Sequence, residues 1–493
     1  MGGYGHVDEF ENSTRGANGE EGTAGAGVRL REEEQRPQED DEEADFTNFV
    51  GMTSSQRQHT PLGLLYGNGG DMSAVPSSTA GVVSFGGPRT VRDYHDIREK
   101  GKSKIFNDPV HGHIRIPGYC CEVIDTKHFQ RLRDLKQLGT IYYVYNGASH
   151  NRFEHSIGTC HIANDVVERF SRFPELEINE ADRRAVALAG LCHDLGHGPF
   201  SHVFEHEWVP AISLKKGISA DHVWRHEDMS NKILDNLYDN HHVDVDMLTK
   251  QDIENVKRLI AGEAYDMEKK FLAEIVANKR NSIDVDKFDY IERDCHNCGV
   301  KSGCDFKRLI EYMKVLDNQI CFKASEVNNL YALFWTRAQL HNTVYTHKKG
   351  KAIEYMVVDA LLAAEESLDL FGKLQDVDSF LELDDTLIRR IEFSKDPGMH
   401  EAREIVKRIR RREIYKHVAD FTIPASYFRQ YQKVTAEDIL EYRKGGVALR
   451  PQDICVHNLK IDWTNSDKNP VDDVRFYHHY DDVKPEPLDK VKN

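Results

Sequence analysis

The sequence contains no long hydrophobic run, and this limits the kinds of protein it can be. Its apolar stretches, such as Val186–Leu191, are far shorter than the roughly 18 residues that a membrane-spanning helix needs. The chain also does not open with a basic and apolar leader that ends in small residues, which disfavours secretion. We therefore expect an intracellular protein with no membrane partner, and the sequence leaves nuclear and cytoplasmic residence open.

Cysteine and hydrophobic residues give further limits. Nine cysteines are an odd number in a long chain without a leader, so reduced thiols are expected. Hydrophobic residues make up 39% of the sequence and charged residues 30%, so we expect part of the chain never to be buried. The formal net charge is −17, of which residues 1–48 supply −10. This acidic balance disfavours a protein whose main role is to coat nucleic acid.

The composition divides the 493 residues into three segments. Residues 1–98 are rich in glycine and acidic residues without sustained apolar periodicity, which predicts a disordered tail. Residues 99–420 show helical spacing of apolar residues and predict a helical core. Residues 421–493 change in texture and predict a small C-terminal lobe that contains β-strands. The expected fold class is therefore mainly α, with a small α+β lobe at the C-terminal end.

Apolar periodicity and capping residues predict the individual elements of the core and the lobe. Asp125 and Thr126 are expected as cap residues within the first helical stretch. The predicted helices are Cys121–Gly139, His155–Phe170, Glu180–Asp194, His226–Tyr238, Asp252–Ile260, Phe271–Ala277, Asp286–Asp294, Phe306–Lys314, Glu326–His347, Lys351–Phe371, Asp376–Arg390 and Met399–Lys416. The predicted strands are Asp453–Trp463 and Val474–Tyr480, joined by a turn through Ser466–Pro470.

The stretch His193-Asp-Leu-Gly-His-Gly-Pro-Phe-Ser-His202 is the most informative part of the sequence. It follows an apolar helix, and it is accompanied by His150-Asn-Arg-Phe-Glu-His155 upstream and Asp284-Val-Asp-Lys-Phe-Asp-Tyr290 downstream. Two imidazoles and two carboxylates form a mixed nitrogen and oxygen ligand set that suits zinc, iron, manganese or nickel. Adjacent helical residues point about 100° apart, so His193 and Asp194 can both bind a metal only beside the helix end. Histidine is frequent here, at 25 residues, and ordinary core or surface histidines are the competing interpretation.

The order of these residues matches the HD superfamily of metal-dependent phosphohydrolases, which has a His, then His-Asp, then a distant Asp. His155, His193–Asp194 and Asp286 fit this order. Four longer blocks strengthen the match, namely Asn107–His113, Phe129–Arg133, Gly147–His155 and Asp284–Tyr290. From about Lys104 to about Tyr480 the sequence resembles the sterile-alpha-motif and HD-domain-containing dNTP triphosphohydrolase family, here without the sterile-alpha-motif domain.

This resemblance implies an HD-type helical core and a reaction that splits a dNTP into a deoxynucleoside and inorganic triphosphate. It implies a divalent transition metal (zinc, iron or manganese) on the four HD residues, and Mg²⁺ bound with the nucleotide. His202 is implied as the general acid, supported by a carboxylate three residues on. That position is Glu205 here, where the relatives have Asp. His197, His226 and Arg152 complete the implied catalytic group.

The resemblance also implies which residues bind the substrate. The phosphate groups fall to Arg152, Lys287 and Arg337, together with His197 and His202. A packed Leu/Tyr pair and two polar side chains recognise the deoxyribose, so that Tyr345 leaves no room for a 2′-hydroxyl. The implied sugar and cavity positions are Gln137, Leu138, Tyr290, Asp294, His341, Tyr345 and Thr346, the last standing where Gln is expected.

Relatives in this family are activated by a guanine nucleotide and then a dNTP, bound between subunits, which convert homodimers into homotetramers. The positions implied for the first site are Lys104, Ile105, Asp125, Gln130, Arg133, Arg403 and Lys407, and those for the second are Asn107, Val144, Arg308, Lys323, Asn329, His347 and Lys348. Lys323 stands where Arg is usual. A role in lowering dNTP pools, in antiviral defence and in innate immunity is implied by the family alone.

Two other functions remain open at this point. The first is an HD phosphohydrolase that acts on another nucleotide, such as a nucleoside monophosphate or a cyclic dinucleotide. The second is a weakly catalytic protein that senses nucleotides or binds single-stranded nucleic acid, because guanine sites and clusters of Arg and Lys can bind either ligand.

Overall fold

The computed structural model describes residues 103–218, 224–240, 243, 248–264, 267–423, 433–459 and 469–491. All of them belong to one compact unit of the chain. The tail predicted over residues 1–98 lies outside the described residues. Within the described ranges, no helix is long and apolar enough to cross a lipid bilayer.

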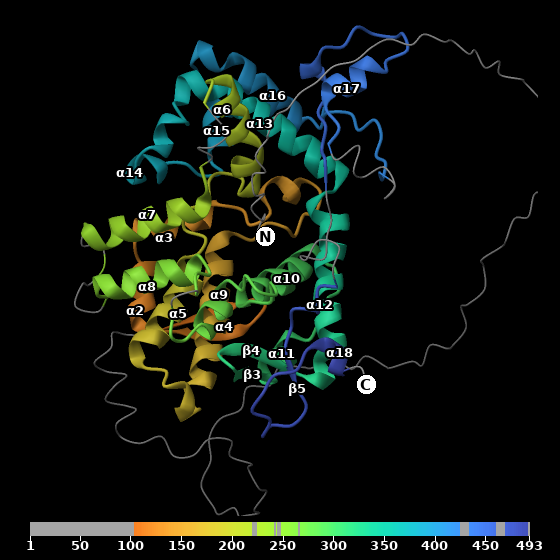
Figure 1. Cartoon of the computed structure of the whole chain (residues 1–493). Helices are drawn as coiled ribbons and strands as arrows, with labels where there is room; N and C mark the ends of the chain where they lie inside the picture. Colours follow the sequence, from red (N-terminus) through yellow and green to blue (C-terminus); the bar gives the residue numbers. More distant parts are fainter. Residues whose placement is uncertain are drawn as a thin grey trace, which may run out of the picture. The chain divides into compact units, whose positions relative to one another are not determined.

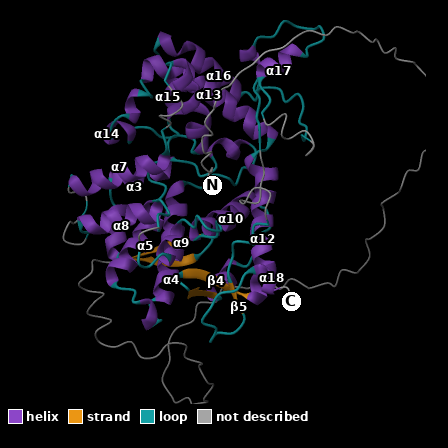
Figure 2. Cartoon of the chain, viewed as in Figure 1, coloured by secondary structure: helices purple, strands orange, loops and turns teal. Residues whose placement is uncertain are grey.

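Helices dominate the described part of the chain, as Figure 2 shows, so the mainly α prediction is confirmed. The helices, labelled as in Figure 1, are α2 (Gly118–Ile124), α3 (Lys127–Gln130), α4 (Arg152–Phe170), α5 (Glu180–Cys192), α6 (Val209–Lys215), α7 (His226–Asp239), α8 (Lys250–Ile260), α9 (Phe271–Val276), α10 (Val285–Cys298), α11 (Phe306–Glu311), α12 (Val327–Leu340), α13 (Lys348–Leu368), α14 (Val377–Phe380), α15 (Leu387–Phe393), α16 (His400–Arg410), α17 (Ala436–Glu441) and α18 (Leu488–Val491). The strands are β1 (Lys104–Asp108), β2 (Gly112–Ile116), β3 (Met313–Leu316), β4 (Gln319–Lys323) and β5 (Phe476–Tyr477).

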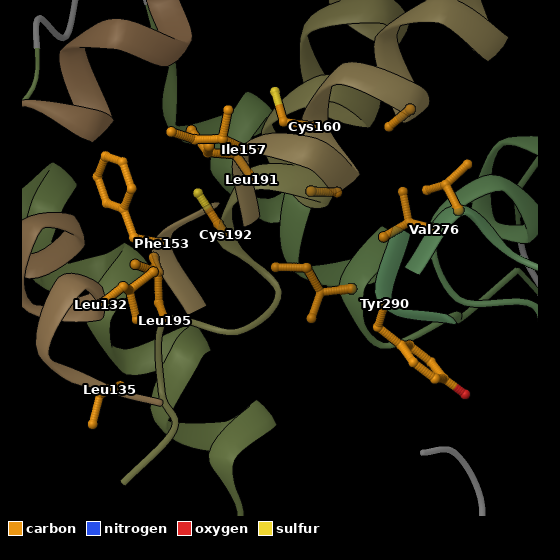
Figure 3. Packing of buried hydrophobic residues seen from close by; sticks show 14 of the residues in the cluster. Leu132, Leu135, Phe153, Ile157, Cys160, Leu191, Cys192, Leu195, Val276 and Tyr290 are labelled. Atoms are coloured by element: carbon orange, nitrogen blue, oxygen red, sulfur yellow. The ribbon is translucent and has the colours of Figure 1, made fainter. Parts of the chain in front are cut away.

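The core is built around α4, which packs against both α5 and α10. Figure 3 shows Phe153, Ile157 and Cys160 of α4 lying near Leu191 and Cys192 at the end of α5. These five side chains are at most 5% exposed. Burial of such a continuous apolar layer stabilises the fold by about 25 cal/mol per Å² of apolar surface removed from water. It also fixes α4, α5 and α10 relative to one another, and these helices carry the HD residues.

The strands form two small sheets. β1 and β2 are an antiparallel hairpin in which Asn107 lies opposite His113. β3 and β4 form a second antiparallel hairpin, and β5 pairs in parallel with β4. The helix predicted over Phe306–Lys314 stops at Glu311, and β3 begins within its predicted end.

The predicted C-terminal hairpin is not found among the described residues. Residues 453–459 contain no strand, and residues 460–468 lie outside the described part. Within Val474–Tyr480 only β5 is a strand, and its partner is β4. The cause is burial, because Phe476 and Tyr477 are at most 2% exposed and pack on the core rather than on a neighbouring C-terminal strand.

The single helix predicted over Cys121–Gly139 is also wrong. The structure has α2 and α3 there, followed by the 3₁₀ turn Arg131–Asp134. Thr126 separates the helices, because its hydroxyl donates to the Val123 carbonyl at 2.7 Å and accepts from the Phe129 N–H at 3.4 Å. A side chain that satisfies backbone groups in this way competes with helix continuation. The predicted cap role of Thr126 is thereby confirmed.

A second predicted helix, Asp376–Arg390, is divided into α14 and α15. The Arg131 guanidinium donates two hydrogen bonds to the carbonyl oxygen of Leu383, which lies between α14 and α15. The donor atoms are Nε at 2.9 Å and Nη2 at 2.6 Å. The Asp385 N–H donates to the carbonyl of the distant Asp134 at 3.1 Å and does not take part in a helical hydrogen bond. Tertiary hydrogen bonds therefore interrupt a segment whose apolar periodicity is helical. The helix predicted over Glu326–His347 also ends early, at Leu340, and continues as the π turn His341–Tyr345.

Candidate metal centre and substrate site

Four side chains converge where α4, the end of α5 and the start of α10 meet. His155 Nε2 lies 3.2 Å from His193 Nε2, 3.2 Å from Asp286 Oδ1 and 3.4 Å from Asp194 Oδ2. His193 Nε2 lies 3.4 Å from Asp286 Oδ1 and 3.5 Å from Asp194 Oδ1. Ligand atoms held about 2.1 Å from one tetrahedral ion lie roughly 3.4 Å apart, so the donor set fits a divalent transition metal. The residues predicted as metal ligands are thus brought together.

Local structure explains how consecutive residues share this centre. α5 ends at Cys192, and His193 is its C-terminal cap residue. Asp194 already lies in the turn that follows, as expected for a metal beside the helix end. α10 begins at Val285 with Asp284 as its N-cap, which sets Asp286 in the first helical turn.

Hydrogen bonds on the far side of each imidazole orient the two histidines. His155 Nδ1 lies 2.8 Å from Asp289 Oδ2, and His193 Nδ1 lies 2.9 Å from the Gly190 carbonyl oxygen. Each acceptor places the proton on Nδ1 and leaves Nε2 free for the metal. Sequence reasoning did not single out Asp289 for this role, although its spacing of three residues from Asp286 on a helix was a usable signal.

The ligand carboxylates are held in the ionised form. Burial alone would raise the pKa of Asp194, but the Arg152 guanidinium and nearby imidazoles outweigh it and hold this pKa well below its usual range. Burial also opposes ionisation of Asp286, but hydrogen bonds from the protonated Nε2 atoms of His155 and His193 bring its pKa well below the usual value in the metal-free protein, and metal binding releases these protons. Ionised carboxylates and neutral imidazoles are the forms that bind metal.

A second cluster of imidazoles lies beside the metal centre. His197 Nε2 is 3.2 Å from Asp194 Oδ1, and the His197 ring stacks on His226 with centroids 3.8 Å apart. His202 meets the edge of His197 at a centroid distance of 5.0 Å. Burial is the main cause that holds the pKa values of His197 and His202 well below the usual range. The predicted catalytic histidines are therefore neighbours of one another and of a metal ligand.

The partner expected for Glu205 needs a correction. The resemblance implied that Glu205 supports His202, but its Oε2 lies 2.6 Å from His226 Nδ1. His202 Nδ1 is buried and has no hydrogen-bond partner among the residues that the structure describes. The reason is local geometry, because Glu205 lies in the π turn Phe204–Trp208 and carries one more methylene than Asp.

The predicted phosphate-binding residues lie around this region, and they differ in the polar groups with which they already interact. Arg152 donates from Nε to Ser201 Oγ at 2.8 Å and pairs with Asp194, while its Nη2 is buried without a partner. Lys287 lies 3.2 Å from the Asp284 carboxylate, to which it is already paired. Arg337 is on α12 and influences the pKa of His341, which burial first and this guanidinium second lower to about 3.

The predicted sugar-binding residues form a buried polar chain. The Tyr345 hydroxyl donates to Asp294 Oδ2 at 2.6 Å, and His150 Nε2 lies 2.7 Å from Asp294 Oδ1. The side-chain oxygen Oε1 of Gln137 and the Tyr290 hydroxyl are buried, and neither has a hydrogen-bond partner within the described part of the chain. Buried unsatisfied polar atoms are uncommon in native proteins and mark positions where a polar ligand can bind. Sequence reasoning missed His150 as a partner of Asp294, although it quoted the block that contains it.

The other predicted cavity residues lie close to this chain. His341 meets the Tyr345 ring edge-on at 4.9 Å, and both lie in the π turn that follows α12. The Thr346 hydroxyl donates to the His341 carbonyl at 2.7 Å, so it is bound to the backbone. Leu138 is half-buried and packs against the hydrophobic core.

The positions predicted for the first activator site fall into separate groups. Lys104 pairs with Asp125, and Arg133 Nε donates to Gln130 Oε1 at 2.9 Å. Ile105 on β1 is 60% exposed. The two predicted positions on α16 contact their own segment instead, with Arg403 donating to the Asp396 carbonyl at 2.5 Å and Lys407 to Glu404 at 2.7 Å.

The positions predicted for the second activator site lie around α11, α12 and the start of α13. The Arg308 guanidinium is bidentate on Glu326, with a shortest distance of 2.7 Å, and Asn329 exchanges hydrogen bonds with the backbone of Asp305. Asn107 lies on β1, and Val144 follows the 3₁₀ turn Gly139–Tyr143. Lys323 ends β4, and its Nζ lies 5.0 Å from the centre of the Tyr312 ring. His347 caps α13, and Lys348 is the first residue of that helix.

Comparison with known proteins decides the family. Residues 152–294 match the HD domain, and residues 304–443 match the HD associated region. The deoxynucleoside triphosphate triphosphohydrolase SAMHD1 homolog of Dictyostelium discoideum is 46% identical over 390 residues, which cover 79% of this chain and 74% of that protein. The chain belongs to the SAMHD1 family.

Two further relatives are similar over most of this chain. Deoxynucleoside triphosphate triphosphohydrolase SAMHD1 of Bos taurus is 39% identical and is matched over 76% of this chain and 69% of its own length. A putative HD domain-containing protein of Acanthamoeba polyphaga mimivirus is 28% identical over 78% of this chain. The recognition made from the sequence and the assignment as an enzyme of the dNTP triphosphohydrolase class are confirmed.

Proposed function

We propose that this chain hydrolyses dNTPs to deoxynucleosides and inorganic triphosphate at the HD centre. The observation that carries the proposal is the position of four convergent metal-binding side chains beside the imidazole cluster of His197, His202 and His226. A divalent ion on these ligands would act as a Lewis acid toward the α-phosphate and would make a nearby water easier to deprotonate. The donor set suits zinc, iron or manganese, with Mg²⁺ accompanying the triphosphate.

The side chains divide the remaining work. In this proposal His202 protonates the departing O5′, and Glu205, which is hydrogen-bonded to His226, orients that neighbouring ring. Burial keeps His202 neutral in the free protein, and a bound tetra-anionic triphosphate favours its protonated form because opposite charges raise a histidine pKa. Arg152, Lys287 and Arg337 supply positive charge for the phosphate oxygens.

We also propose that the chain of His150, Asp294 and Tyr345 selects the deoxyribose. Asp294 and Gln137 are the polar groups available for a 3′-hydroxyl, and the Tyr345 ring closes the space that a 2′-hydroxyl would need. Asp294 is 1% exposed, so it gives a strong and directional contact. No base-specific group stands out among these residues, which favours all four dNTPs as substrates.

Product analysis with purified protein tests this reaction. Each dNTP is incubated with and without GTP, and the products are separated by anion-exchange chromatography. Deoxynucleoside and triphosphate are expected, whereas diphosphate or monophosphate would show that the chain is an HD enzyme of another kind. Chelation should abolish turnover and Mn²⁺ should restore it. Undiminished turnover by His202→Ala would refute the acid assignment.

Regulation by nucleotides is the further part of the proposal. We infer that GTP or dGTP and then a dNTP bind at the two predicted sets of positions and convert homodimers to homotetramers. The exposed charged side chains Lys104, Arg133 and Arg308 support it, since exposed cations suit nucleotide phosphates. Sedimentation analysis with GTP and a slowly hydrolysed dNTP should show a tetramer, and an unchanged monomer or dimer would refute this part.

The cellular role is proposed on the same basis. An intracellular enzyme of this kind would lower dNTP pools and thereby restrict viral DNA synthesis. The measurement is the dNTP content of cells that express the protein or its His193→Ala variant.

A further inference from the structure

The block Asn107–His113 matches the family in sequence, yet the function above uses only Asn107. In the structure two other residues of this block, Asp108 and His111, contact the buried side chains that support the metal ligand His155. His111, between β1 and β2, places Nε2 2.7 Å from Asp289 Oδ1. Asp108, the last residue of β1, accepts from Arg293 Nη1 at 2.9 Å.

Asp289 is the centre of this buried network. Its Oδ2 accepts from the metal ligand His155 at 2.8 Å, and both of its oxygens accept from Arg293 at 2.8 Å. The side chains of Asp289 and Arg293 are fully buried, and that of His111 is 7% exposed. A buried carboxylate with every lone pair engaged has one orientation, because losing any partner leaves an unsatisfied group in a medium of low dielectric.

We propose that His111 is a positioning residue for the metal centre, acting through Asp289 on His155, and that the β1–β2 hairpin is thereby coupled to metal binding. His111 is hydrogen-bonded to Asp289, and Asp289 in turn is hydrogen-bonded to the metal ligand His155. It fixes the rotation of the Asp289 carboxylate, which fixes the ring plane and tautomer of His155. A ligand whose supporting partner is disturbed binds its metal more weakly.

The hairpin gives this network a regulatory meaning, which rests on the proposed activator sites. Lys104, Ile105 and Asn107 lie on β1, and Asp108 follows directly in the same strand. A nucleotide that binds at these positions and shifts β1 therefore also shifts Asp108, which accepts a hydrogen bond from Arg293. Coupling between two binding sites is reciprocal, so metal binding must change GTP affinity by the same factor as GTP changes metal affinity.

The positioning role is tested by metal affinity in the absence of nucleotide. Metal-free protein is titrated with Mn²⁺ against a chelating dye. His111→Ala should weaken Mn²⁺ binding by about 10-fold, the lower end of the range for lost support of a ligand. His111→Gln should recover most of the affinity, since its amide nitrogen can occupy the place of Nε2. His113→Ala is the matched control, because His113 is exposed on the same hairpin.

Each outcome of this titration decides the proposal. If His111→Ala and His113→Ala bind Mn²⁺ equally well, the positioning role is overturned. A purely structural role would lower the melting temperature of metal-free His111→Ala without reducing the rise that saturating Mn²⁺ produces. A reduced rise in melting temperature, rescued in His111→Gln, supports positioning.

The coupling is tested separately by GTP affinity. Wild-type protein should bind GTP with different affinity when metal-free and when loaded with Mn²⁺, and His111→Ala should bring the two values together. Equal affinities in the wild type overturn the coupling. Absence of any GTP binding overturns both the coupling and the proposed activator sites, while the chelator titration still decides the positioning of His155.

Discussion

Replacing Glu205 is the sharpest perturbation of the proposed chemistry. Its Oε2 lies 2.6 Å from His226 Nδ1, and its side chain is 7% exposed. Glu205→Gln keeps the size and an acceptor oxygen but removes the charge. A hydrogen bond to a charged group contributes about 1.5–3 kcal/mol. If His226 needs this support only in the transition state, the turnover number should fall roughly 10- to 150-fold, at 1.36 kcal/mol for each factor of ten.

The control comes from the same π turn. Glu207 Oε1 pairs with Lys351 Nζ at 3.2 Å, on another side of the turn from His226, so Glu207→Gln removes an acid without touching the imidazole cluster. Triphosphate release at saturating dGTP gives kcat for both variants. Since Glu205 acts through His226, KM should change much less than kcat.

Glu205→Asp refines this test. Aspartate is shorter by one methylene and cannot keep the 2.6 Å contact without a shift of the π turn. We expect an intermediate kcat, between those of the wild type and Glu205→Gln. Equal kcat values for Glu205→Gln and Glu207→Gln would refute the reasoning, because the hydrogen bond to His226 would then have no part in the rate-limiting step.

Three further predictions follow from buried pairs. Tyr345→Phe removes the hydroxyl on Asp294 but keeps the ring, so kcat/KM for dGTP should fall about 10- to 100-fold while GTP is still rejected, as steady-state kinetics will show. Glu326→Gln frees the Arg308 guanidinium for phosphate, and the dNTP concentration for half-maximal activation should drop several-fold unless Arg308 lies outside the activator site. Burial opposes ionisation of Asp289, but Arg293 and two imidazoles outweigh this effect and hold the pKa of Asp289 well below its usual value. The ionised carboxylate therefore stabilises the fold at pH values above its unfolded-state pKa of about 3.9, and this stabilisation is lost as the pH falls further, through the pKa of the folded state. Thermal melts of Asp289→Asn from pH 3 to 7 should show a lower melting temperature at neutral pH and a flatter acid limb.

Helices that bury one apolar face are predictable from the sequence alone. α4, α8 and α10 lie within a few residues of their predicted bounds because local periodicity and caps determine them. Where prediction fails, a distant partner decides. Arg131 donates a hydrogen bond to the Leu383 carbonyl and so interrupts a segment with helical periodicity. β5 pairs with β4 instead of forming the predicted C-terminal hairpin. No window of adjacent residues contains either partner.

The candidate site shows the same division. The prediction of a shared metal centre came from the order of the four HD side chains, which resembles the HD superfamily, because the residue types alone left ordinary core or surface histidines as a competing interpretation. The supporting groups were not predictable in this way. Asp289 and His111 are 178 positions apart, and only the fold brings them within 2.7 Å. Glu205 is only three residues from the expected partner His202, but in the π turn its carboxylate lies against His226.

Two of the positions that differ from the residues implied by the resemblance lie in or directly after a π turn, and a third, Lys323, ends β4. Phe204–Trp208 carries Glu205, and His341–Tyr345 precedes Thr346. A π turn holds one residue more than an α-helical turn, so it rotates the side chains on either side of it relative to one another. Substitutions in such a turn can be absorbed by local rewinding, whereas a substitution in α4 or α10 would displace a metal ligand. The two π turns therefore orient side chains around the acid and the sugar pocket, whereas the metal ligands His155 and Asp286 lie on the regular helices α4 and α10.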